Sequence, residues 1–140
     1  MIQKMICSLI CLLLLAACAS SQKNRIKPSE LTNLVELRQP DISDSAPADI
    51  YLDSVEQGLY RDKPALLIHG SFPDGCTHLK SVDHELAENI LILKIDAWRN
   101  PDLLCTQALV SFSYIYTALP ENRFNRIDSV RYDGARYLLK

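Results

Sequence analysis

The sequence predicts an all-β protein, an antiparallel β-sandwich of about seven strands that follows an export signal and a flexible tether. Two observations predict the sandwich: short β-type runs alternate with turn residues from residue 48 onward, and this part of the chain has no long helical pattern. A third is the composition, since 140 residues with 48% hydrophobic and 23% charged side chains suit one globular domain. We therefore expect a signal peptide at residues 1–17, a tether at 18–47 and the β-sandwich at 48–140.

The first 17 residues have the pattern of an export signal. Lys4 provides a positive charge, an apolar run at 5–15 is interrupted only by Ser8, and the small residues Ala16 and Ala17 follow. This run is shorter than the roughly 20 residues that a transmembrane helix needs. A cleaved signal is therefore favoured over a permanent transmembrane helix.

The end of this leader resembles a bacterial lipobox. The residues are Leu15, Ala16, Ala17 and Cys18, and in a lipobox the cysteine becomes the first mature residue. The resemblance implies a diacylglycerol and an N-acyl chain on Cys18, which together would anchor the protein to a membrane. Ala19 after the cysteine then favours the outer membrane, on its periplasmic or its surface face. A conventional leader with an incidental cysteine is the alternative.

The cysteines agree with export. Of the five, Cys7 and Cys11 lie in the leader and Cys18 is assigned to lipid, which leaves Cys76 and Cys105. An even pair in an oxidising compartment predicts one disulfide, which would stabilise the domain by about 3–4 kcal/mol. A redox-active or metal-binding pair is the alternative, although no C-x-x-C arrangement is present.

The segment 18–47 is polar, contains Pro28, Pro40 and Pro47, and has too little apolar surface to order itself. Ser29 could cap a short helix over residues 29–38, whose apolar residues have near-helical spacing. Such a helix would either dock on its own domain or bind a partner.

The remaining chain is divided into strands by turn residues. The predicted strands are 50–56, 65–71, 81–87, 90–98, 109–117, 125–132 and 135–139. The run 90–98 alternates most clearly, with Leu91, Leu93, Ile95 and Ala97 inward and Trp98 outward. We expect the connection between the first two strands at Gly58 and residues 62–64. Asp133 and Gly134 predict a type I′ hairpin between the last two, and the whole pattern suits an immunoglobulin-like sandwich.

An aromatic stripe occurs within the strand 109–117. Phe112, Tyr114 and Tyr116 share one face at strand spacing. We expect this face in the core; an outward aromatic contact surface is the alternative.

Two segments around the cysteines resemble a family of little-characterised exported bacterial proteins, often lipoproteins. They read GSFPDGCT at 70–77 and CTQALVSF at 105–112, where the family pattern is G-x-x-P-[DN]-G-C followed by C-T-Q-A-L-V-P-F. The match covers residues 48–140, but Ser111 replaces the usual proline and the final hairpin matches loosely. The resemblance implies a small exported β-sandwich of unknown activity, supports pairing of Cys76 with Cys105, and brings no catalytic residues.

No pattern in the sequence indicates catalysis. The balance of 15 basic and 17 acidic residues disfavours nucleic acid as a partner. His69, His78 and His84 match no metal-site spacing, and neither a G-x-S-x-G elbow nor a phosphate-binding glycine loop occurs. We therefore expect no enzyme activity, no cofactor and no metal site.

The function that best fits is a noncatalytic binding or assembly module, anchored to the cell envelope through Cys18 and bound to another envelope protein. Candidate binding residues are Phe72, Asp74, His78 and Trp98. The alternative is an inhibitor of a periplasmic hydrolase, a protease or lysozyme, that presents the loops 72–78 or 100–105. A metal-binding protein is a weaker alternative.

Overall fold

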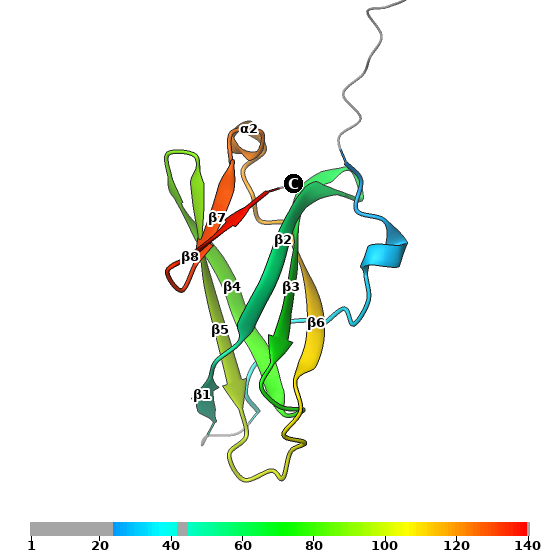
Figure 1. Ribbon diagram of the computed structural model, residues 1–140, viewed down its shortest axis with the longest axis vertical. Helices are drawn as coiled ribbons and strands as arrows, with labels where there is room; N and C mark the ends of the chain where they lie inside the picture. Colours follow the sequence, from blue (N-terminus) through cyan, green and yellow to red (C-terminus); the bar gives the residue numbers. More distant parts are fainter. Residues whose placement is uncertain (1–23, 42–44, 140) are drawn as a thin grey trace, which may run out of the picture.

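The computed structural model describes residues 24–41 and 45–139, and these form eight strands in two sheets (Figure 1). The strands are β1 (Ala46–Ala48), β2 (Tyr51–Tyr60), β3 (Lys63–Phe72), β4 (Thr77–Ala87), β5 (Ile90–Arg99), β6 (Val110–Tyr116), β7 (Ser129–Tyr132) and β8 (Ala135–Leu138). Two short helices, η2 (Pro28–Glu30) and α2 (Glu121–Phe124), complete the described elements. The predicted all-β sandwich is confirmed: β2 to β8 correspond to the seven expected strands, and β1 and α2 were not expected.

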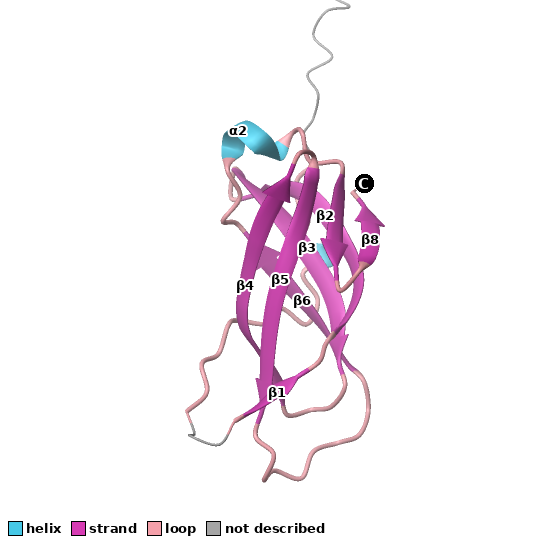
Figure 2. Cartoon of the chain, turned by 90° about the vertical axis from the view of Figure 1, so that its left-hand side faces the viewer, coloured by secondary structure: helices cyan, strands magenta, loops and turns pink. Residues whose placement is uncertain are grey.

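The two sheets form the two layers seen in Figure 2. One has the order β2-β3-β6. In the other, β5 is central: β4 pairs along its whole length, whereas β1 and β7 pair with its two ends, and β8 adds to β7. Between the named strands, all pairings are antiparallel except that of β5 with β7, which is parallel.

The hydrophobic core lies between the sheets. Leu66, Ile68 and Phe112 enter it from the three-stranded sheet, and Leu79 and Leu91 from the other, each at most 2% exposed. The aromatic stripe of β6 belongs to this core, because Phe112 and Tyr116 are buried and Tyr114 packs against them.

Two hairpin turns of the sandwich each contain two residues with positive φ, and only one of them contains a glycine. Asp133 and Gly134 both have positive φ, 46° and 78°, as the predicted type I′ hairpin requires. The β2–β3 connection is instead the pair Arg61 and Asp62, with φ of 49° and 64°. The sequence prediction for this turn was right at Asp62 and wrong at the other positions, because Gly58 lies within β2 and residues 63 and 64 lie within β3.

Residues 24–41, here called the strap, belong to the domain and are not a free tether. The predicted helix over 29–38 is wrong: only η2 is helical, and an extended chain follows it. The strap pairs its backbone with the edges of β2, β6 and β4. The bonds run from Ile26 N–H to Leu59 O, Leu59 N–H to Asn24 O, Ser113 N–H to Asn33 O, Val35 N–H to Ser113 O, and Arg38 N–H to Leu79 O. These strand edges offer unpaired N–H and C=O groups, which an extended segment satisfies and a helix does not.

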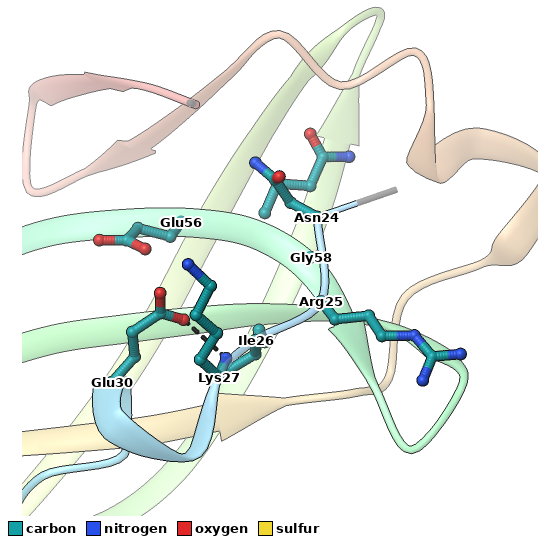
Figure 3. A pocket seen from close by; sticks show the side chains of 8 residues that line it. Asn24, Arg25, Ile26, Lys27, Glu30, Glu56 and Gly58 are labelled. Atoms are coloured by element: carbon teal, nitrogen blue, oxygen red, sulfur yellow. Dashed lines mark hydrogen bonds between the residues drawn. The ribbon is translucent and has the colours of Figure 1, made fainter. Parts of the chain in front are cut away.

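Gly58 allows the strap to cross β2 closely. A Cβ atom at this position would lie 2.8 Å from Asn24 O and 2.9 Å from Ile26 Cγ1. Figure 3 shows the strap passing over Gly58, with the side chain of Lys27 rising toward Glu56. The missing side chain at residue 58 therefore allows Asn24 and Ile26 to lie directly against β2.

Candidate functional site

The disulfide end of the sandwich comprises the β3–β4 turn, residues 73–76, and the β5–β6 loop, residues 100–109. It lies at the opposite end of the long axis from Asn24, where the described chain begins (Figures 1 and 2). Cys76 and Cys105 are joined here, with Cα atoms 5.7 Å apart and a sequence separation of 29. The predicted pairing is confirmed, and it joins two connections that each cross from one sheet to the other.

Asp74 organises the turn beside the disulfide. The side chain is buried; Oδ1 accepts hydrogen bonds from Cys76 N–H at 2.9 Å and the Thr77 hydroxyl at 2.8 Å, and Oδ2 lies 3.2 Å from Arg99 Nη1. Burial raises the pKa of the Asp74 carboxyl, but the hydrogen bonds and the Arg99 charge outweigh it, so the net pKa is lowered. The sequence analysis named Asp74 as a candidate binding residue, whereas in the structure its carboxylate holds the turn through these contacts.

This carboxylate is expected to make the domain acid-sensitive. Because the pKa is lower in the folded than in the unfolded chain, Asp74 stabilises the fold above its ordinary pKa of about 3.9, and this contribution disappears as the pH falls below that value. Asp74→Asn should lower the unfolding free energy at pH 7 by about 1–3 kcal/mol and flatten the loss of stability in acid. Urea denaturation from pH 7 to 2.5 measures both. Asp62→Asn, at an exposed ion pair with Arg25, is the control and should have little effect at either pH.

The β5–β6 loop is held by its own chain and by the neighbouring turn. Asn100 Oδ1 accepts a hydrogen bond from Asp102 N–H at 2.9 Å, and Gly75 N–H donates to Thr106 O at 3.3 Å. A Cβ atom at Gly75 would lie 2.7 Å from Thr106 Oγ1, so a larger residue there would require the Thr106 side chain to move. Together with the disulfide at Cys105, these bonds fix both sides of the loop.

Three leucines of this loop have no place in the core. Leu103 is 54%, Leu104 104% and Leu109 66% exposed. Exposed apolar side chains gathered at one end of a small domain indicate a contact surface. Sequence reasoning selected the loop 100–105 but missed these leucines, although two adjacent leucines after an Asn-Pro-Asp turn are a visible signal.

Trp98 and His78 lie beside the disulfide end, where Trp98 is buried and His78 is partly buried. They are cross-strand neighbours whose rings are 5.2 Å apart, and Trp98 is only 4% exposed. Trp98 Nε1–H donates to Arg38 O at 2.6 Å, so the strap covers the residue that the sequence placed outward. Burial, followed by the charge of Arg38, lowers the pKa of His78. The strap therefore removes Trp98 from the candidate contact surface.

The remaining predicted residues do not join this surface. Phe72 is buried and stacks on Phe112 with ring centroids 4.4 Å apart, so its role is in the core. His69 Nδ1 contacts Ser113 Oγ at 2.9 Å, and His84 Nδ1 contacts Tyr116 OH at 2.6 Å, each at a separate place.

Cys18 lies outside the described residues. Within residues 24–41 and 45–139, no helix is long and apolar enough to cross a bilayer, and no three metal-ligating side chains come together.

The comparisons with known proteins agree with the fold. A family model described as the ORF11 beta-sandwich domain matches residues 66–124, from β3 to α2, a range that includes both disulfide cysteines. Over this range the chain is similar to a β-sandwich domain. No curated protein and no solved structure matches it.

Proposed function

We propose that this chain is a lipid-anchored protein of the bacterial cell envelope, noncatalytic, whose β5–β6 loop binds another envelope protein. The observation that carries the proposal is a loop fixed by a disulfide that nevertheless presents three exposed leucines, of which Leu104 is fully exposed. The lipobox-like end of the leader and the resemblance of the cysteine segments to exported lipoproteins support the location.

The loop has the energetic properties of a binding surface. Burying one leucine contributes about 1.5–3 kcal/mol, so Leu103, Leu104 and Leu109 could together supply much of a stable contact. Because the disulfide and the Asn100 turn already hold the loop, little conformational entropy is lost on binding.

The geometry points the loop away from an N-terminal anchor. Only residues 19–23 separate Cys18 from Asn24, and this segment spans at most about 20 Å. The ten-residue strands β3 and β5 are about 33 Å long, and the loop lies at their far end from Asn24. This arrangement supports a partner that lies on the side of the domain remote from the anchoring bilayer.

Two measurements in the native host test the proposal. Mass analysis of the mature protein should show diacylglycerol and an N-acyl chain on Cys18, and Cys18→Ala should release the protein from membranes. A photoreactive amino acid at position 104 should crosslink to one envelope protein, whereas the same group at position 138, also exposed at 72% but in β8, should not. An unmodified amino terminus contradicts the anchor. Equal crosslinking from both positions contradicts the loop.

A further inference from the structure

We infer that the partner of the β5–β6 loop is the substrate cleft of a protease, and that Leu104 enters an aliphatic specificity pocket there. This inference rests on the proposed binding role of the loop and assigns the class of partner. It makes the chain an inhibitor whose specificity depends on one side chain.

The side chain of Leu104 is fully exposed to solvent. Its exposure of 104% equals that of an isolated residue, so its side chain is available to fill a pocket of a partner. Within the described part of the chain, neither its N–H nor its C=O takes part in a backbone hydrogen bond. Proteins that bind extended chain recognise main-chain groups by hydrogen bonds and individual side chains by pockets, and Leu104 offers both.

The residues on both sides of Leu104 are held firmly. The Asn100 turn precedes it, and Cys105, in the disulfide, follows it directly. Hydrolysis of the bond between Leu104 and Cys105 would add one water and give a carboxylate and an amine, but β5 and the disulfide would keep the two new ends in place. Cleavage of this bond would therefore not release a product, whereas an ordinary loop is a good substrate because its cleavage does.

The chemistry of the loop disfavours a lipid surface as its binding partner. Between residues 100 and 110 the only charged side chain is Asp102, which an anionic membrane repels. The unpaired backbone of Leu104 would also lose hydrogen bonds to water in hydrocarbon without gaining others. A protein cleft that supplies hydrogen-bonding groups beside an apolar pocket avoids both costs.

Inhibition of proteases with known pockets tests the inference. We expect the mature chain with its disulfide intact to inhibit chymotrypsin, which has a hydrophobic pocket, and not trypsin, whose pocket carries an Asp. Leu104→Asp should weaken inhibition of chymotrypsin at least about 100-fold, since a charge would be buried in an apolar pocket. Leu104→Lys should transfer inhibition to trypsin. Leu138→Asp, at an exposed leucine of β8, is the matched control and should inhibit like the wild type.

Three results would overturn the inference. These are the absence of chymotrypsin inhibition by the wild type, rapid cleavage after residue 104 with loss of the chain, and unchanged inhibition by Leu104→Asp when circular dichroism shows a native fold. The crosslinking experiment separates this failure from that of the proposed function. If position 104 captures an envelope protein while chymotrypsin is not inhibited, the binding role stands and the protease cleft is wrong.

Discussion

Replacing both Cys76 and Cys105 with serine is expected to lower the free energy of unfolding by about 3–4 kcal/mol, because the disulfide closes a loop with a sequence separation of 29 in the unfolded chain. A domain of this size has a total stability of roughly 5–15 kcal/mol, so the loss is a large share of it. Urea denaturation followed by circular dichroism measures the change. The wild type treated with a reductant should unfold at the same urea concentration as the double variant.

The same variant should also lose binding through the loop, because Leu104 would no longer be held beside a fixed Cys105. This effect is measurable under conditions where the variant is still folded, such as low temperature without urea. An unchanged unfolding midpoint would show that the hydrogen bonds of Asp74 and Gly75 hold the disulfide end without the covalent link.

Trp98→Ala should destabilise the domain by about 3–5 kcal/mol, the cost of removing a buried aromatic side chain. It also removes the hydrogen bond to Arg38 O, and with it one of the attachments of the strap. Trp98→Phe keeps most of the buried surface and should cost about 1 kcal/mol for the lost hydrogen bond, plus the smaller ring. Urea denaturation followed by circular dichroism gives these values without depending on tryptophan fluorescence.

Amide hydrogen exchange shows whether the strap is released. In Trp98→Ala we expect faster exchange at Arg38, whose N–H is bonded to Leu79 O. Gly58→Val is the matched control at the other end of the strap, since its side chain would displace Asn24 and should speed exchange at Ile26 instead. Unchanged exchange at Arg38 in Trp98→Ala would contradict the role given to Trp98 in holding the strap.

Much of the sandwich could be predicted from the sequence because its signals are local. The alternation in β5 and the aromatic stripe of β6 need only neighbouring residues to be recognised, and the Asp133–Gly134 hairpin depends on one pair of dihedral angles. The Arg61–Asp62 turn was predicted only at Asp62, because two residues that are not glycine adopt the left-handed conformation there.

The candidate site was predicted only in part. Cysteine arithmetic identified Cys76 and Cys105, and turn residues outlined the loop after β5. Residue type suggested Phe72 and Trp98 as contacts, yet both are buried, because exposure depends on which distant segment packs over a strand. The leucines 103 and 104 would pass for core residues by type alone.

By itself, the sequence determined that the body is a β-sandwich, where most of its strands run, and which cysteines are available to join. Only the tertiary structure decided that residues 24–41 close the strand edges, that Trp98 is hidden and that Leu104 is free. The reason is the range of the forces involved. Periodicity and turn preference act over a few residues, whereas the bond from Trp98 to Arg38 joins positions 60 residues apart and exists only after both sheets have formed.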